Sequence, residues 1–101
     1  MPSDPNSTMI QPIGSGVALT VASAKAIGEN PSRQGLELHN PSASINVYVA
    51  PANVVTSPGG AGWFLIFPGA SKIFDGLRAT CGWNAAMASS TGNISILEWF
   101  K

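Results

Sequence analysis

Proline and glycine interrupt this chain so often that only short extended segments fit between them. The tripeptide Asn-Pro-Ser occurs twice, at 30–32 and at 40–42, and most of the 11 glycines and 8 prolines fall between apolar runs. Proline has no N–H to donate to a central β-ladder, and it biases the preceding residue away from the helical region. The sequence therefore predicts short strands separated by turns, and no helix of three turns.

Between these turn residues, apolar and polar side chains alternate. Residues 33–40 (RQGLELHN) and residues 45–50 (INVYVA) both show the period of two that is typical of a half-buried strand. Because only a Pro-Ser-Ala-Ser link joins the two segments, we predict that they form an antiparallel hairpin.

Several further segments also have strand character. We expect residues 22–30 to supply one helical turn at most, residues 81–89 to be a strand with a helical turn as the alternative, and residues 89–93 to be the hairpin turn before the last strand. The full set of further expected strands is 16–21, 62–67, 71–75, 81–89 and 92–100. About seven short strands predict a single all-β domain: an antiparallel β-sandwich, or a small barrel or jelly-roll-like arrangement.

The first 15 residues differ from the rest of the chain. They contain three prolines, they do not alternate, and their apolar anchors are Met9, Ile10 and Ile13. We predict an extended N-terminal arm over residues 1–15, disordered alone or laid along a neighbour, and a β-sandwich domain over residues 16–101.

The charge of the chain limits the partners that it can bind. Only 10% of the residues are charged, and the five basic and five acidic residues cancel to a net charge of zero. Nucleic-acid binding needs clustered cations, and a membrane-spanning helix needs about 18 consecutive apolar residues. We therefore predict neither nucleic acid nor membrane as a partner, and no signal peptide, so that the chain is made in a cytoplasm. A neutral surface with few charges favours association with other protein.

Residues that could carry chemistry are few and scattered. His39 is the only histidine, and it has no metal-ligating residue at ligand spacing. Cys81 is the only cysteine, which excludes an intrachain disulfide and favours a small apolar packing role. Nothing in the sequence links Asp75 to Glu98 as a carboxylate pair. The sequence therefore predicts no enzyme, no catalytic residue, no metal site and no cofactor.

Three tryptophans allow two interpretations. Trp63, Trp83 and Trp99 could stack on sugars, or they could lie in the core or at a subunit interface, which we favour for Trp63 and Trp99. Trp99 and Phe100 are adjacent and must point to opposite faces of a strand. One of them therefore leaves the core, which implies a protein interface.

The last strand and the long loop complete the predicted interface. In 92–100, we expect Ile94 and Ile96 to share the core face with Glu98 and Phe100, so that Leu97 and Trp99 point outward. The loop 50–62 carries two central valines. We expect this loop either to form a contact surface or to fold over the core of its own domain. The predicted interface residues are Met9, Ile10, Ile13, Val54, Val55, Trp63, Leu97 and Trp99.

Four of these segments together resemble small virion proteins of tailed bacteriophages. The shared patterns are Arg-x-x-Leu-x-Leu-x-Asn at 33–40, Val-Tyr-Val at 47–49, Pro-Gly-x-Ser at 68–71 and Ile-x-Ile-x-Glu at 94–98. The resemblance spans roughly residues 16–100, and its motifs are mostly strand and turn chemistry.

The resemblance implies a β-sandwich accessory of the virion, a decoration (cement) protein that stabilises the capsid surface. Its implied partners are the major capsid protein or other virion proteins, and it implies a homo-oligomer, with a trimer favoured. The alternative is a carbohydrate- or receptor-binding module, at a fibre or spike base, that uses exposed tryptophans.

Overall fold

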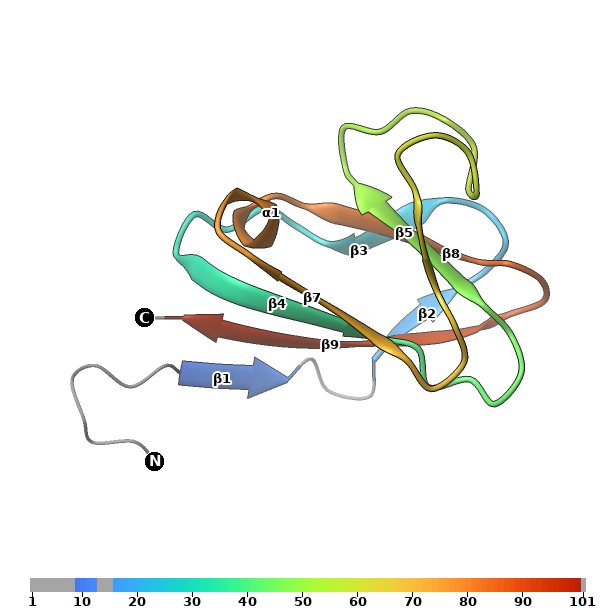
Figure 1. The fold of residues 1–101 in the computed structure, drawn as a ribbon, viewed down its shortest axis with the longest axis horizontal. Helices are drawn as coiled ribbons and strands as arrows, with labels where there is room; N and C mark the ends of the chain where they lie inside the picture. The colour runs from blue at the N-terminus through green and yellow to red at the C-terminus, as the bar shows by residue number, and fades with distance from the viewer. Residues whose placement is uncertain (1–8, 13–15, 101) are drawn as a thin grey trace.

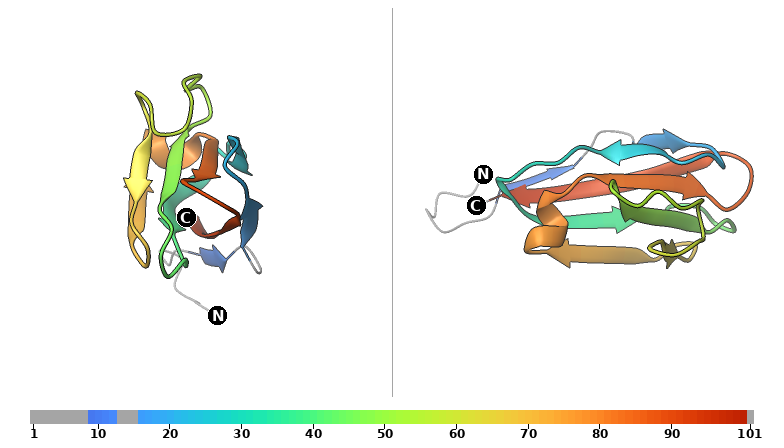
Figure 2. Two further views of the ribbon diagram at one scale, coloured as in Figure 1. Left: turned by 90° about the vertical axis from the view of Figure 1, so that its right-hand side faces the viewer. Right: turned by 90° about the horizontal axis from the view of Figure 1, so that it is seen from above.

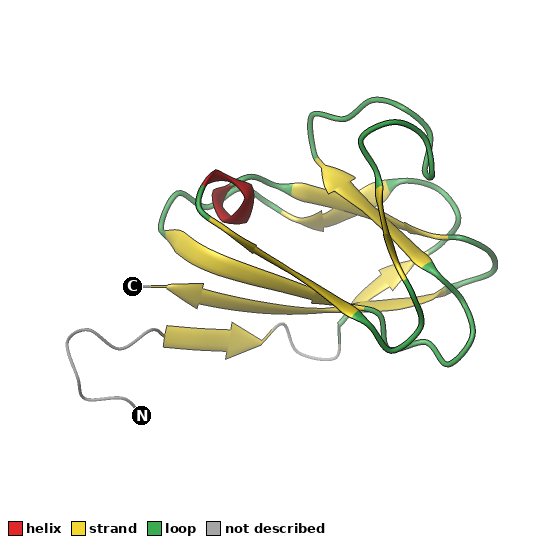
Figure 3. Ribbon diagram, viewed as in Figure 1, coloured by secondary structure: helices red, strands yellow, loops and turns green. Residues whose placement is uncertain are grey.

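The computed structural model describes residues 9–12 and 16–100, and these residues form an all-β fold with one short helix (Figures 1 and 3). The elements are β1 (Met9–Pro12), β2 (Val17–Leu19), β3 (Ala24–Ile27), β4 (Arg33–His39), β5 (Val47–Pro51), β6 (Phe64–Ile66), β7 (Ser71–Asp75), α1 (Leu77–Thr80), β8 (Trp83–Met87) and β9 (Gly92–Phe100).

The strands form two antiparallel sheets that pack face to face (Figure 2). One sheet has the order β1-β9-β4-β7, with β2 also paired to β9. The other has the order β3-β8-β5-β6. β1 pairs with the C-terminal half of β9 and β2 with its N-terminal end. The predicted all-β sandwich is confirmed, and the two open sheets do not close into a barrel.

The predicted hairpin of residues 33–40 and 45–50 is wrong. β4 pairs with β7 and β9 in the first sheet, whereas β5 pairs with β6 and β8 in the second. The link between β4 and β5 crosses from one sheet to the other, and the buried Asn40 fixes that crossing. Its side-chain amide donates to the carbonyl of Ile45 at 2.8 Å and to that of Ile66 at 2.9 Å.

The structure differs from the sequence analysis at two other places: one expected hairpin turn is wrong, and one strand was not expected. Residues 89–93 are not a hairpin turn, because β8 and β9 belong to different sheets. Residues 22–30, expected to give one helical turn at most, contain β3, which pairs with β8. The burial of Ala26 and Ile27 in the core overrides the weak helical preference of this segment. The single helical turn, α1, instead follows β7.

The predicted arm contains β1. Residues 9–12 pair with residues 97–100 of the same chain, so this part of the arm extends the first sheet. The remaining residues of the predicted arm, 1–8 and 13–15, lie outside the described residues.

The core lies between the two sheets. The predicted core face of β9 is confirmed at Ile94 and Ile96, which are buried, whereas Phe100 is only half-buried. The other core side chains follow the same alternation along the strands, and the fully buried ones include Leu19, Leu36, Leu38, Val47, Val49, Ile66 and Trp83.

Both copies of Asn-Pro-Ser form the same turn. The backbone N–H of Ser32 donates to Asn30 Oδ1 at 3.0 Å, and the N–H of Ser42 donates to Asn40 Oδ1 at 3.0 Å. These Asx turns lie directly before and after β4. In each, the asparagine side chain accepts the hydrogen bond that a backbone carbonyl would otherwise accept, which ends the extended strand.

Candidate docking surface

The two predicted interface valines lie on the loop between β5 and β6. Val54 is half-buried, and its methyl groups lie against Gly62, which has a φ of +90°. Val55 is 95% exposed. The hydroxyl of Thr56 donates to the carbonyl of Ala61 at 2.6 Å, which closes the loop on itself. The loop therefore packs one valine internally and presents the other to solvent.

The remaining predicted interface residues belong to the first sheet or to the part of the arm that lies outside the described residues. Met9 and Ile10 lie in β1, which pairs with the end of β9. Ile13 lies outside the described residues. Leu97 is half-buried, and its register partner on the other side is Pro12 of β1.

The three tryptophans have different environments. Trp83 is fully buried, and its ring stacks on Phe74 with the centroids 4.2 Å apart. Trp63 is half-buried and donates from Nε1 to the carbonyl of Thr56 at 3.1 Å, so it holds the loop. Only Trp99 lies on the outer face of the first sheet, as predicted from the alternation of β9.

The Trp99 indole lies directly on the backbone of β4. Its register partner is Gly35, and a Cβ atom at position 35 would overlap indole atoms Cε2, Cζ2 and Nε1. Glycine is therefore required at this position for the ring to lie on the sheet. One face of the indole covers Gly35, and the residue as a whole is half-buried.

Three large exposed hydrophobic residues lie in or near β7, the edge strand of the first sheet. Phe67 precedes the strand and is 61% exposed, Ile73 lies within it and is 65% exposed, and Leu77 follows it at the start of α1 and is 88% exposed. Among the described strands, none pairs with the free edge of β7. We call Phe67, Ile73 and Leu77 the β7 ridge.

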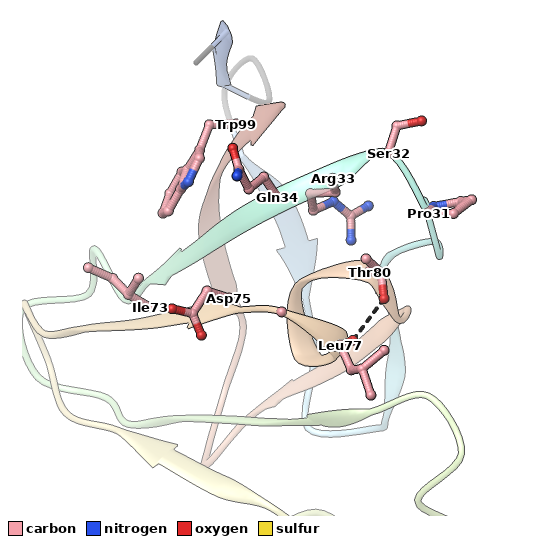
Figure 4. Close-up of a pocket in the computed structure, with 10 residues that line it drawn as sticks. Pro31, Ser32, Arg33, Gln34, Ile73, Asp75, Leu77, Thr80 and Trp99 are labelled. Atoms are coloured by element: carbon pink, nitrogen blue, oxygen red, sulfur yellow. Dashed lines mark hydrogen bonds between the residues drawn. The ribbon is translucent and has the colours of Figure 1, made fainter. Parts of the chain in front are cut away.

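A shallow depression separates the β7 ridge from Trp99 (Figure 4). Ile73 and Asp75 line it from β7 and Leu77 from α1, and Gln34 of β4 lies on the other side, next to Trp99 of β9. We call this hollow the Trp99 depression. Its walls combine apolar side chains with a carboxylate and an amide.

The arginine beside this depression is already fully engaged. The side chain of Arg33 is buried and donates from Nε to Glu98 Oε1 at 2.9 Å. Its other nitrogens donate to the carbonyls of Gly28 at 2.7 Å, Ala79 at 2.8 Å and Cys81 at 3.2 Å. Arg33 therefore joins the ends of β4, β9 and α1, and its charge is compensated within the fold.

The groups considered for chemistry are apart from one another. His39 Nδ1 and Ser71 Oγ share a hydrogen bond of 2.8 Å between β4 and β7. Cys81 is half-buried, and its thiol donates to the carbonyl of Arg78 at 3.3 Å. In the parts of the chain that the structure describes, no group of three or more His, Cys, Asp or Glu side chains could hold a metal ion. Over the same residues, no helix is long and apolar enough to cross a membrane.

The chain matched no protein-family profile, no curated protein and no solved structure.

The sequence analysis missed the β7 ridge. A signal for Ile73 was present, because Ile73 and Phe74 are adjacent in a strand and one of them must point away from the core. A signal for Phe67 was also present, because it ends the continuous apolar run 62–67 that was expected to be a strand. No comparable signal existed for Leu77, which lies outside the strands, where alternation does not apply.

Proposed function

We propose that the chain is a structural accessory protein of a tailed-phage virion, which decorates and stabilises the capsid by binding the major capsid protein or another virion protein. The resemblance of residues 16–100 to small phage virion proteins supports the class of protein. The β7 ridge supports the mode of action, because three exposed hydrophobic residues beside an open strand edge form a surface suited to another protein.

The single observation that carries the proposal is the exposure of Ile73 in the edge strand β7 and of Phe67 and Leu77 in the segments that flank it. Edge strands are usually protected by charges, and β7 carries Lys72 and Asp75 but leaves Ile73 between them 65% exposed. An isolated exposed side chain needs no explanation, whereas three along one edge favour a partner.

A decoration protein needs no chemistry of its own. Weak contacts repeated over a closed shell add up, because each bound contact raises the effective concentration of the next. Closed symmetry places such proteins on local axes as homo-oligomers, and we favour a trimer.

The proposal is tested by co-sedimentation with shells assembled from the capsid protein of its virion. We expect Phe67→Ser and Leu77→Ser each to weaken docking about tenfold or more, because truncating a buried interface anchor commonly costs about 2 kcal/mol. Val21→Ser is the matched control, since Val21 is 55% exposed but follows β2, which pairs with β9 and not with β7. Docking by the ridge variants that equals wild-type docking would show that the ridge is not the interface. Absence of docking by the wild-type chain would reject the virion function.

A further inference from the structure

The Trp99 indole forms a flat platform on the outer face of the first sheet. Gly35 lies beneath the ring, and a side chain at that position would lift the ring off the strand. The absence of a side chain at position 35 therefore lets the indole lie directly on the strand. Its remaining surface borders the Trp99 depression.

A β-bulge places a polar side chain beside this platform. The register of β4 against β9 advances by two residues, from Arg33 to Gly35, while β9 moves by one, from Phe100 to Trp99. Gln34 is the extra residue, and it is exposed. Bulges commonly re-aim a side chain at functional surfaces. Figure 4 shows the Gln34 amide next to the indole.

A carboxylate lies across the same row of the sheet. Asp75 of β7 pairs with Gly35 of β4, which pairs with Trp99 of β9. Asp75 is exposed and lines the depression together with Gln34. A carboxylate accepts hydrogen bonds and an amide both donates and accepts them, so the two groups suit a ligand that carries several hydroxyls.

The charge of the depression excludes one class of such ligands. Arg33 is the only cationic residue in its lining, and that guanidinium already pairs with Glu98 and three backbone carbonyls. The remaining charge is the carboxylate of Asp75. An acidic sugar would therefore meet repulsion without a free cation to bind it.

We propose that the Trp99 depression is a binding site for a neutral hexopyranose of a glycan chain, stacked on the indole and hydrogen-bonded by Gln34 and Asp75. The C–H face of a β-linked pyranose is flat and apolar, which matches the open side of an aromatic ring, while its equatorial hydroxyls point sideways towards polar groups. The site is open at one side, so that a sugar within a longer chain can enter it. Ile73 and Leu77 of the β7 ridge also line this depression, whereas Phe67 does not.

Tryptophan fluorescence tests the proposal directly. The protein carries Trp63→Phe, so that the remaining signal comes from the buried Trp83 and from Trp99. Cellohexaose and chitohexaose serve as neutral probes, and an oligo-α-guluronate is the acidic control. We expect saturable quenching by at least one neutral probe at millimolar concentrations and none by the guluronate.

Substitutions of Trp99 and its polar neighbours test whether the glycan binds at the Trp99 indole. Trp99→Leu keeps an apolar cover over Gly35 but removes the aromatic face, and Trp99→Phe keeps a smaller ring. Binding is measured by calorimetry, which does not need the Trp99 signal. We expect Trp99→Leu to weaken binding at least about tenfold, Trp99→Phe to weaken it less, and Gln34→Ala and Asp75→Asn to weaken it about three- to tenfold each.

Three results would overturn the proposal. The first is the absence of saturable binding by both neutral probes, and the second is tighter binding of the guluronate than of either neutral probe. The third is wild-type glycan affinity in a folded Trp99→Leu variant, and if that variant also loses shell docking, Trp99 belongs to a protein interface. If Trp99→Leu loses its cooperative melting transition, the exposed pair Gln34→Ala and Asp75→Asn decides, and unchanged affinity in both rejects the site. Failure of shell docking by Phe67→Ser leaves this test unaffected, because Phe67 does not line the depression.

Discussion

At the scale of single residues, the two copies of Asn-Pro-Ser differ in how many hydrogen bonds their asparagine side chains make and in how deeply those side chains are buried. Asn30 and Asn40 both form an Asx turn with the serine two residues later. Asn40 is fully buried and also donates to two carbonyls from different parts of the chain, whereas Asn30 is half-exposed. Sequence alone predicts the shared turn, and only the fold distinguishes the two positions.

This difference predicts unequal costs of substitution. Asn40→Ala removes the donor to the buried carbonyl of Ile66 and to the part-buried carbonyl of Ile45, and we expect it to lower the free energy of unfolding by about 2–4 kcal/mol. Asn30→Ala, the matched control, removes one turn hydrogen bond and costs about 1 kcal/mol or less. Urea denaturation of both variants measures the two losses. Equal losses would show that Asn40 does not fix the crossing between the sheets.

Arg33 is the second residue on which distant segments depend. Its guanidinium is bound by Glu98 and by the carbonyls of Gly28, Ala79 and Cys81. The sequence analysis placed Arg33 only at the start of an alternating strand, because nothing in a local pattern shows that a charged residue is buried.

We expect Arg33→Met to destabilise the fold by about 3–5 kcal/mol, because it leaves a largely buried carboxylate and several carbonyls without a donor. Glu98→Gln keeps an oxygen that can accept from Arg33 Nε, so its cost should be smaller, at about 1–2 kcal/mol. Thermal and urea unfolding compare the two variants. A cost for Arg33→Met no larger than for Glu98→Gln would mean that the carbonyl contacts add no stability.

At the scale of elements, alternation predicted where most strands lie and which face is buried, but not which strands pair. The pattern of Leu36 and Leu38 in β4 is the same as that of Val47 and Val49 in β5, yet the two strands lie in different sheets. Alternation of apolar and polar residues shows that one face of a strand is buried, but it does not show which other strand pairs with it. Partner choice depends on contacts such as that of Asn40 with Ile66, which joins residues 26 positions apart in the chain.

The N-terminal segment gives a prediction at this scale. β1 pairs with the C-terminal half of β9 at the end of the first sheet, and residues 16–100 supply the other strands of both sheets and a buried core between them. We therefore expect a chain that lacks residues 1–15 to keep its β fold but to dock more weakly to its assembly. Circular dichroism and co-sedimentation with shells measure the two properties. Loss of the folded signal would show that β1 is an integral strand of the domain.

At the scale of the whole molecule, the candidate surfaces were predictable only where strands carry them. Trp99 was placed outward by the alternation of β9, and the exposure of Ile73 follows the same rule. The Trp99 depression itself could not be predicted, because it joins Gln34 of β4 to Asp75 of β7, and their proximity depends on sheet order.

The few charges of the whole chain predict how docking responds to salt. Five basic and five acidic residues leave no net charge, and the β7 ridge consists of Phe67, Ile73 and Leu77. Raising NaCl from about 0.1 M to about 1 M shortens the Debye length from about 10 Å to about 3 Å and suppresses contacts between exposed charges. Burial of apolar surface is not weakened by this screening. We therefore expect the affinity for shells, measured by co-sedimentation across this range, to change by less than about threefold. A weakening of tenfold or more would instead assign the contact to exposed charges such as Lys72 and Asp75 and would contradict docking through the ridge.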